Sequence, residues 1–419
     1  MGIISASYRL GENLPATSIE SPASWFMNLM GSKRSISGVD VDPDNAISLS
    51  TVFNALLLLS ESIAQLPVNP IITEPLGVGV DKKVSSRRIY REHPSYELVA
   101  KRPNDHMTSH TFRKVMMVNA TKYDRAYAII RRNNVGMPIE LLPIPSPWVQ
   151  TKLVDGQLVY RVTNYLDGGK VEYLTDYSML HIIGYTDNGF EGRSRVEILA
   201  NSLGNAISSE NFASEYFGKG VNVSGFIKVP SMLKDETAVD RLKRSFVKAV
   251  AGKDNQFGVG LLEGGSEWIK NETNPEEAQL METRKFDAVR VAQIWNIPVT
   301  LLKHLERGTY NNVEQLDIEF SKYTLQPWVT NWEQELERKL LTEAEKREGL
   351  IYYKFNMNAM LRGDMETRGK YYESMTKTGA FSPNKILELE DEEGFEGGDV
   401  HVVPSGYQTL EQLKENSDA

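Results

Sequence analysis

The spacing of hydrophobic residues predicts that ordered structure begins after residue 45. Residues 1–45 are rich in Gly, Ser, Pro and Asn and show little periodicity, so we expect a partly disordered N-terminal arm. Beyond it, apolar residues recur every three or four positions and would line one helix face that ends before Pro67. These residues are Val52, Ala55, Leu56, Leu59, Ile63 and Leu66. A loop is predicted for 70–86 and a second helix for 109–119.

The pattern between residues 126 and 185 is typical of short strands. Segments 126–131 and 139–144 flank a turn sequence that contains Asn133, Asn134 and Gly136. Segments 148–153 and 158–162 flank Asp155-Gly156, which is a stronger hairpin signal. A further strand is predicted for 179–185, so this block should be rich in β-structure.

Helical periodicity returns at residue 194. Ser194 and Glu197 have the spacing of a capping box, and the helix they begin should stop at Gly218 to Gly220. Strands are expected at 223–229, 257–262 and 267–270, with a helix at 234–251. Asn274 followed by Pro275 is a strong start signal for a helix that should end near Asn296, before Pro298.

The longest predicted helix begins at Val313 and runs for about 30 residues, or about 45 Å. Two apolar stripes lie on either side of Pro327, where we expect a kink. The stripes are Val313, Leu316, Phe320 and Tyr323, and then Trp328, Trp332, Leu336 and Leu340. A strand at 351–356, helices at 364–377 and 382–389, and an acidic tail complete the chain.

Composition places the 419-residue chain among soluble proteins of two to three domains. Its net charge of -9 argues against tight binding to a partner as acidic as DNA. The absence of cysteine excludes disulfides, thiolate metal sites and cysteine nucleophiles. No run of residues is apolar enough to cross a membrane, and no signal peptide is expected.

Motifs of enzymatic chemistry are missing. Gly169-Lys170 and Gly252-Lys253 lack the following Ser or Thr of a phosphate-binding loop, and no hydrolase or zinc-protease motif occurs. His106 and His110 have a spacing that could hold a metal in a helix, but a surface loop leading into a helix explains them as well. We therefore predict no catalytic residue, no metal and no cofactor.

Two features remain after this search. Four basic residues fall on one side of the helix predicted at 234–251, either as a partner-binding stripe or as an ordinary solvated face. They are Lys234, Arg241, Arg244 and Lys248. The second feature is the segment 301–312, between two strong helices, which is either a functional loop or a plain connector.

Several blocks in this order resemble tailed-bacteriophage portal proteins of the branch with shorter chains. The resemblance covers about residues 45–400, and its most specific parts are the blocks at 276–286 and 309–315. Those two blocks read Glu276-Glu277-Ala278-Gln279-Leu280-Met281-Glu282-Thr283-Arg284-Lys285-Phe286 and Thr309-Tyr310-Asn311-Asn312-Val313-Glu314-Gln315. Supporting blocks are Ala126 to Ile130, Leu141 to Ile144, Met179 to Ile182, Glu191 to Ser194, Ala213 to Phe217, Ser224-Gly225 and Ile297 to Val299.

The resemblance implies an α+β portal fold with named regions. These would be an arm (1–45), the first part of a β-rich wing (46–194), a stem helix (195–219), a small α/β clip (220–273) and a second stem helix (274–298). A tunnel loop (299–312), a long kinked tunnel helix with the second part of the wing (313–359), and a short helical crown with the acidic tail (360–419) would follow.

The resemblance also implies a function. Portal proteins form a ring, usually of twelve copies, at one capsid vertex of the virion, and they assemble in the host cytoplasm. Double-stranded DNA passes through the ring without sequence specificity, a terminase with its large subunit drives packaging, and a head-tail adaptor and the major capsid protein or scaffold are neighbours. No membrane is involved.

Carried onto this chain, the resemblance gives two sets of site residues. The tunnel loop would bring Lys303, His304 and Arg307 near DNA, with a shape set by Thr309, Tyr310, Asn311 and Asn312. The basic stripe at 234–248 would be the partner surface of the clip. Alternatives are a metal-dependent DNA-processing enzyme that uses Asp364, Glu366 and the acidic tail, or a head-tail scaffold that never contacts DNA.

Overall fold

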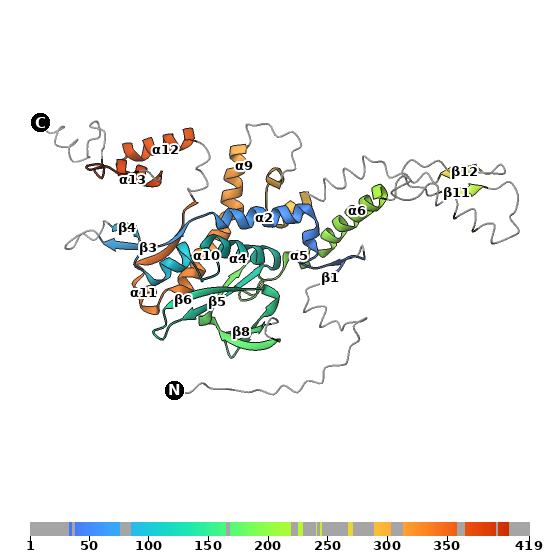
Figure 1. Ribbon diagram of the computed structural model, residues 1–419, viewed down its shortest axis with the longest axis horizontal. Helices are drawn as coiled ribbons and strands as arrows, with labels where there is room; N and C mark the ends of the chain where they lie inside the picture. The colour runs from blue at the N-terminus through green and yellow to red at the C-terminus, as the bar shows by residue number, and fades with distance from the viewer. Residues whose placement is uncertain are drawn as a thin grey trace, which may run out of the picture. The chain divides into compact units, whose positions relative to one another are not determined.

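The chain combines helices with small sheets in the computed structural model, in agreement with the predicted α+β class (Figure 1). The structure describes residues 33–35, 38–75, 85–164, 168–218, 225–228, 240, 244, 267–270, 289–302, 313–357, 365–390 and 393–401. The chain divides into two compact units. The first comprises Met1–Gln65 and Asn69–Lys354, and the second comprises Leu66–Val68 and Phe355–Ala419.

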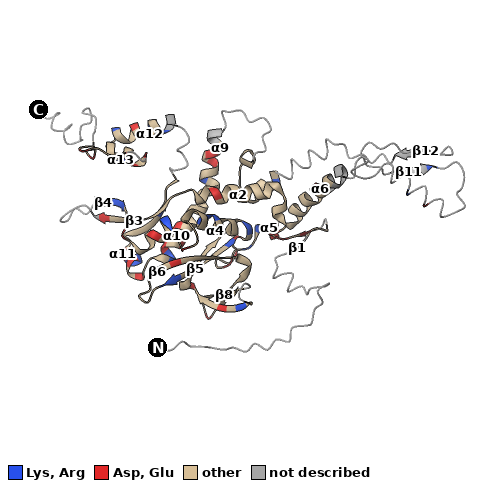
Figure 2. Ribbon diagram, viewed as in Figure 1, with Lys and Arg blue, Asp and Glu red and all other residues tan. Residues whose placement is uncertain are grey.

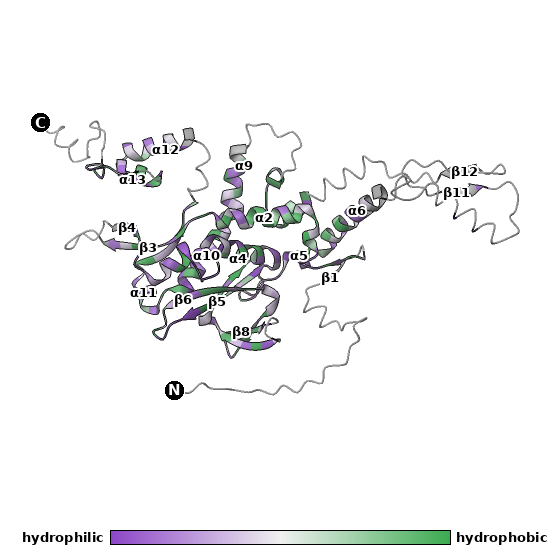
Figure 3. Cartoon of the chain, viewed as in Figure 1, coloured by the Kyte–Doolittle hydropathy of each residue, from purple (hydrophilic) through white to green (hydrophobic). Residues whose placement is uncertain are grey.

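Two helices of fifteen residues each pack against each other in the first unit: α2 (Ser50–Ala64) and α4 (Ser109–Tyr123). The predicted α2 face is confirmed, because Val52, Ala55, Leu56, Leu59 and Ile63 are all buried. Figure 3 shows hydrophobic residues concentrated along α2. The helix α4 begins where Thr108 accepts a hydrogen bond from the Thr111 N–H, and it runs four residues beyond the predicted end at 119.

Both predicted hairpins are present. Strands β5 (Arg125–Arg132) and β6 (Pro138–Ile144) pair, with β10 (Met179–Ile183) on the other side of β5. Strands β7 (Val149–Val154) and β8 (Gln157–Asn164) pair across Asp155 and Gly156. Those two residues have φ angles of 49° and 77°, the positive values that a tight hairpin turn requires.

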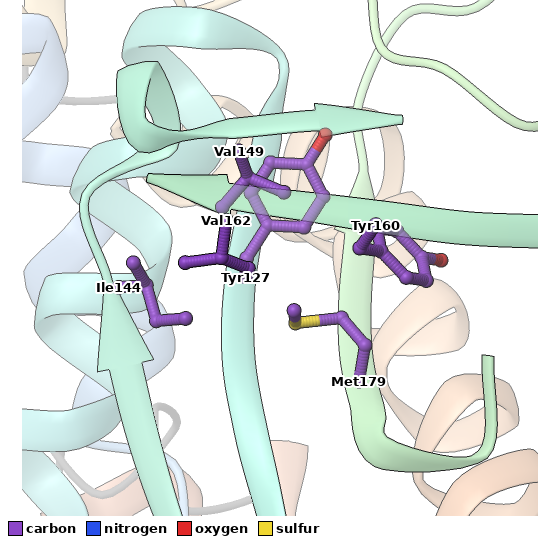
Figure 4. Close-up of a cluster of buried hydrophobic side chains, with 6 residues drawn as sticks. All are labelled: Tyr127, Ile144, Val149, Tyr160, Val162 and Met179. Carbon is purple, nitrogen blue, oxygen red and sulfur yellow. The ribbon is translucent and has the colours of Figure 1, made fainter. Parts of the chain in front are cut away.

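The sequence did not predict strand β9 (Lys170–Thr175), which joins the second hairpin in the order β7-β8-β9. Five of its six residues are exposed, so it lacks the alternation of buried and exposed positions that identifies a strand. The two sheets meet over a cluster of buried side chains shown in Figure 4. This cluster consists of Tyr127, Ile144, Val149, Tyr160, Val162 and Met179.

The loop predicted for 70–86 is wrong at both of its ends, and its middle lies outside the described residues. Strands β3 (Val68–Pro75) and β4 (Ser85–Ile89) occupy the two ends, and β3 lies at the centre of a sheet ordered β13-β3-β4. The predicted strand at 351–356 is present as β13 (Ile351–Phe355). The Thr73 N–H donates to the Leu350 carbonyl at 2.8 Å. Partners distant in sequence therefore stabilise β3 although Pro70 removes one donor from it.

The helix predicted from residue 194 begins as α5 (Arg195–Ile198), is interrupted at Leu199, and continues as α6 (Ala200–Gly218). Its buried positions include Val196, Ala200 and Leu203, which lie three to four residues apart and share one face. Strands β1 (Lys33–Arg34) and β2 (Asp40–Val41) pair with each other and pack against α6. A short 3₁₀ turn, η1 (Ala46–Ser48), leads from there into α2.

The longest helix contains a segment of different helical geometry. It runs through α9 (Val313–Glu319), the π-helical segment η9 (Phe320–Leu325) and α10 (Gln326–Leu340). Trp328, Trp332, Leu336 and Leu340 are buried as predicted. Tyr323 was predicted to be buried and is 57% exposed, because the π turn holds an extra residue and shifts the helix phase by about 100°.

Shorter elements complete the first unit. The segment Pro94–Tyr96 (α3) and the π turn Glu97–Lys101 (η2) precede α4, and 3₁₀ turns lie at Ser146–Trp148 (η3), Asp176–Ser178 (η5) and Val299–Leu302 (η7). Helix α11 (Glu343–Glu348) follows α10 and begins with a capping box between Thr342 and Glu345. Strands β11 (Gly225–Lys228) and β12 (Glu267–Lys270) pair antiparallel, and the predicted elements between them lie outside the described residues.

The second unit contains α12 (Met365–Lys377) and α13 (Pro383–Leu389), close to their predicted bounds. Ser382 caps α13 by accepting from the Lys385 N–H at 3.3 Å. Glu390, which belongs to the predicted acidic tail, pairs with Arg368 at 2.6 Å and accepts from the Tyr372 hydroxyl at 2.5 Å. This part of the acidic cluster is therefore engaged in structure.

Candidate functional site

The predicted site residues lie mostly outside the described part of the chain. This holds for Lys303, His304, Arg307, Thr309, Tyr310, Asn311 and Asn312, and for Lys234, Arg241 and Lys248. Arg244 is described, and its exposed side chain donates from Nε to the Asp240 carbonyl at 3.3 Å. These roles stay predictions. The structure does describe both ends of the segment 303–312, and the site is built from those ends.

The first end of the segment is held by buried side chains. The helix described from residue 289 ends at Ile294 and a turn at Trp295 and Asn296 follows, shortly before Pro298, which cannot donate a helical hydrogen bond. Asn296 has a φ of 54°, and the next residue's N–H bonds back to the Ala292 carbonyl at 3.0 Å. Ile297 and Leu302 are each 4% exposed, and η7 packs against α2. The chain therefore leaves a fixed position at Leu302.

The second end is the start of α9 at Val313, seven residues before the π segment η9. Pro327 lies one turn beyond Tyr323 and has no N–H to offer the Tyr323 carbonyl. That carbonyl instead accepts a hydrogen bond from Asn296 Nδ2 at 3.4 Å. In return, Thr324 Oγ1 donates to the Asn296 carbonyl.

These two hydrogen bonds join the chain that precedes segment 303–312 to the chain that follows it. Thr324 is 4% exposed, so its hydroxyl needs this partner, and Asn296 satisfies it with a main-chain oxygen. We call Asn296, Tyr323, Thr324 and Pro327 the loop clamp. The clamp therefore binds the chain that precedes the segment directly to the long helix that follows it.

A buried ion pair holds the start of α5 near the helix that leads to the loop clamp. Asp124 is fully buried at the end of α4 with a φ of 55°, and its carboxylate accepts from Arg195 at two atoms. The Arg195 N–H reaches Oδ2 at 2.7 Å and Arg195 Nε reaches Oδ1 at 2.7 Å. The Tyr185 N–H adds a third bond to Oδ1 at 2.9 Å. The charge is thus compensated and the start of α5 is fixed.

The same pair contacts the helix that leads to the loop clamp. Arg195 Nη1 donates to the Ile294 carbonyl at 3.4 Å, and its guanidinium lies 5.8 Å from the centre of the Trp328 ring on α10. Trp295 Nε1 donates to the Thr121 carbonyl on α4 at 3.0 Å. Together these contacts join α4, α5, α10 and residues 289–296 into one junction.

Two glycines permit this close packing. A Cβ on Gly192 would overlap the main-chain carbonyl of Asp124, and a Cβ on Gly184 would overlap its carboxylate and lie 3.0 Å from Trp328. The Gly184 N–H donates to the Asp124 carbonyl at 2.8 Å. No other residue type would fit at Gly192 without moving the backbone.

The electrostatics of the junction are structural in character. Burial raises the pKa of Glu197 in the first turn of α5, although the positive charges of Arg125 and Arg193 oppose that rise.

His110 lies 3.6 Å from Glu61, and the described residues contain no group of three or more His, Asp or Glu side chains able to hold a metal. Among these residues, no helix is long and apolar enough to cross a membrane.

The sequence reading missed the residues that build the clamp and the junction. Asn296 and Pro298 were used only as a helix end, and Ser194-Arg195 only as a helix start. Asp124 and Thr324 carried no local signal, because their partners lie 71 and 28 residues away in sequence. A Pro within a long helix was the one usable hint, since it frees a carbonyl that some donor must satisfy.

Comparison with known proteins places these features in a family. The model of the family described as phage portal protein matches residues 50–391. The portal protein of Enterobacteria phage HK97 is 26% identical over 380 residues, which cover 90% of this chain and 87% of that protein. The probable portal protein of Streptomyces phage phiC31 is 26% identical over 363 residues, with coverage of 85% and 77%.

Solved structures have the same fold at lower sequence identity. An HK97-family phage portal protein from Corynebacterium diphtheriae gives a TM-score of 0.55 at 18% identity, over 77% of this chain and 98% of that one. A chain from the virion of a native gene transfer agent particle gives 0.54 at 18% identity, over 84% and 94%. A chain from the neck of such a particle, computed with C12 symmetry, gives 0.50 at 16% identity, over 88% and 99%.

Proposed function

This chain belongs to the phage portal protein family, and from that premise we propose that twelve copies form a closed ring at one capsid vertex of a virion. Double-stranded DNA would pass through the ring during packaging and again during ejection. The observation that carries the proposal is the match of the family model to residues 50–391. The C12 symmetry used for a similar neck structure supports the copy number.

The regions would keep the roles that the family pattern implies. The body around the core cluster (46–194) would be the first part of the wing, and α5, α6 and residues 274–298 would be the stem. The β11–β12 pair lies within the proposed clip (220–273), and α12 and α13 within the crown (360–419). Twelve helices, each about 10 Å wide, would surround an opening near 28 Å, enough for a DNA duplex.

The loop clamp supports the role proposed for segment 303–312. A loop that holds DNA on the channel axis needs a firm support, and the clamp binds the two elements that flank this loop to each other. Lys303, His304 and Arg307 would contact phosphates from this loop. Thr309, Tyr310, Asn311 and Asn312 would set its shape.

The acidic charge of the chain supports a channel through which DNA slides rather than a protein that binds DNA tightly. The chain has a net charge of -9, and α9, which follows the loop directly, carries Glu314, Asp317 and Glu319 and no basic residue (Figure 2). Acidic walls repel phosphates on average, so DNA would slide without being retained, and the few basic side chains of the loop would make brief contacts.

The partners follow from the same role. A separate terminase, with its large subunit as the motor, would supply the ATP-driven step, since this sequence contains no phosphate-binding loop. The clip stripe of Lys234, Arg241, Arg244 and Lys248 would meet the terminase during packaging and a head-tail adaptor afterwards. The major capsid protein or a scaffold would surround the wing, and assembly would take place in the host cytoplasm.

The mass and symmetry of the purified protein test this function. Native mass spectrometry and particle averaging should give a closed ring with an open channel, and a stable monomer or dimer would contradict the proposal. The rival nuclease would cleave DNA with a divalent metal, and a scaffold without DNA contact would give no effect of loop charge on packaging.

A charge reversal tests the loop itself. The double variant Lys303→Glu and Arg307→Glu should lower the DNA packaged per particle by at least tenfold while rings still form. The matched control reverses two exposed charges outside the loop, Arg91→Glu and Lys152→Glu, and should package normally. Equal packaging by both variants would refute the role of the loop.

A further inference from the structure

A groove of about 580 Å³ lies in the first unit between the hairpin β7–β8 and one side of α10. Its hydrophobic wall includes Leu153, Leu158, Tyr177 and Phe190. Leu153 and Leu158 are paired across the hairpin on the same sheet face as the buried Tyr160 and therefore continue the core face outward. Yet Leu153 is 56% exposed and Tyr177 is 58% exposed. The core face thus extends beyond what the described chain covers.

The opposite wall is polar but electrically balanced. Asn331, Glu335 and Arg338 line it from positions one and two turns apart on α10. Arg338 binds the Glu335 carboxylate at 2.8 Å and Asp176 at 2.9 Å, and Lys339 binds Asp176 at 2.6 Å. Two carboxylates face two cations, so the wall offers no net charge to attract a charged ligand.

The floor of the groove contains an unsatisfied polar atom. His181 is 2% exposed, its ring stacks on Tyr127 with centroids 4.3 Å apart, and Nδ1 lies 3.2 Å from the Tyr160 hydroxyl. His181 Nε2 has no hydrogen-bond partner among the described residues. A groove with an uncovered apolar wall, a neutral polar wall and an unused nitrogen favours an uncharged, largely apolar occupant that brings some hydrogen-bonding groups.

The N-terminal arm contains a segment of that chemistry. Residues 25–30 read Trp25-Phe26-Met27-Asn28-Leu29-Met30, and the chain carries no charge from Ser21 to Ser32. Five large apolar side chains in six residues are costly to leave in water. We propose that this segment of the same chain, which we call the arm segment, docks in the groove and completes the wing core.

Only Gly31 and Ser32 separate the arm segment from Lys33, where the described chain begins. β1 begins at Lys33 and pairs with β2, and Asp44, shortly after β2, accepts from the Tyr123 hydroxyl at 3.0 Å. Tyr123 ends α4, and the strand that follows carries Tyr127 to the groove floor. The eight residues from Trp25 to Lys33 span at most about 27 Å. The tether also keeps the arm segment at a high effective concentration near the groove.

Engineered cysteines test the proposal cleanly because the natural chain has none. Full-length protein carrying Asn28→Cys and Gln157→Cys, the latter lining the groove, is treated with a short bismaleimide and analysed by peptide mass spectrometry. The matched control pairs Asn28→Cys with Val135→Cys, which is 83% exposed on the β5–β6 turn. We expect the groove pair to cross-link within one chain at least tenfold faster than the control pair.

Further outcomes identify which chain occupies the groove and whether the apolar side chains of the arm segment hold it there. Cross-links between different chains, seen as dimers on a denaturing gel, would assign the groove to a neighbouring copy and overturn the proposal, as would equal rates for the two pairs. Adding Trp25→Ser and Phe26→Ser to the groove pair should slow its cross-linking to the control rate. The proposal does not rest on the ring, and native mass spectrometry of the same samples reports ring formation independently.

Discussion

The side-chain amide of Asn296 donates to the main-chain carbonyl of Tyr323 at 3.4 Å, about one helical turn before Pro327. Tyr323 lies in the π-helical segment η9, where the regular hydrogen-bond pattern of the long helix is interrupted. The end of the preceding helix contacts the long helix at this irregular segment. The contact ties the chain before segment 303–312 to the chain after it.

Asn296 should be sensitive to replacement for two separable reasons. Asn296→Gly keeps the positive φ available and loses only the exposed hydrogen bond, so the free energy of unfolding should fall by about 0.5 kcal/mol. Asn296→Ala also places a Cβ in a left-handed conformation and should cost about 1 kcal/mol more. Urea unfolding of the two variants measures the difference, and equal stability would contradict a left-handed Asn296.

The Asp124–Arg195 pair should be among the most costly to break. Asp124→Ala leaves Arg195 without its carboxylate in a site where Asp124 is fully buried, and the free energy of unfolding should fall by about 3 kcal/mol or more. Arg131→Ala removes a pair with Glu140 in which the arginine side chain is 63% exposed, and it should cost less than about 1 kcal/mol. Chemical denaturation compares them, and similar losses would argue against the junction.

Two glycine-to-alanine changes should have opposite signs. Gly192→Ala forces a methyl group against the Asp124 carbonyl and should destabilise the first unit by several kcal/mol, about 3 or more. Gly369→Ala lies within α12 with nothing within 4 Å of the new methyl group, and it should stabilise the helix by about 0.5–1 kcal/mol. Thermal melts followed by circular dichroism test the pair. A tolerated Gly192→Ala would mean that the loop at 184–194 sits further from Asp124.

Stability should fall in mild acid because two histidines are buried as neutral rings. Burial lowers the pKa of His181 well below 6.5, and the charges of Lys339, Arg125 and Arg338 lower it further. Burial also lowers the pKa of His93, against the opposing pull of Glu345. The unfolded chain takes up protons near pH 6.5 and the folded chain does not, so stability is complete above that pH and declines below it.

The variant His181→Phe should flatten this dependence. Unfolding midpoints measured from pH 7.5 to 5.0 should drop less steeply in the variant than in the parent protein, even if the variant is less stable throughout. His93→Gln should remove a smaller part of the same slope, because Glu345 partly offsets the effect of burial there. An unchanged slope in both variants would mean that neither ring is held neutral in the folded state.

Family membership accounts for the absence of enzymatic motifs. Portal proteins are structural components, so the prediction of a non-enzymatic protein is confirmed by the family rather than by missing residues. The resemblance seen in the sequence blocks is confirmed in the same way. The boundaries of arm, wing, stem, clip, loop and crown, and the roles of the loop and clip residues, stay predictions that the experiments above address.

The sequence by itself determined the elements whose signals are local. Asp155-Gly156 specified the β7–β8 hairpin because its backbone angles favour only a few turns, and the spacing of Trp328, Trp332 and Leu336 specified the buried face of α10. The capping residues Ser194 and Ser382 marked helix starts for the same reason. In each case the residues that decide the structure lie within one turn of chain.

Tertiary structure decided what depends on distant partners. Strand β3 exists beside β13 although 70–86 read as a loop, and the π turn at 320–325 rotated Tyr323 outward although the periodicity placed it inside. The structural role of Asp124 depends on Arg195, which lies 71 residues later in the sequence. A buried charge or carbonyl needs a hydrogen-bonding or charged partner, and the fold can bring that partner from a distant part of the chain. The spacing of residues in the sequence does not predict such a pair.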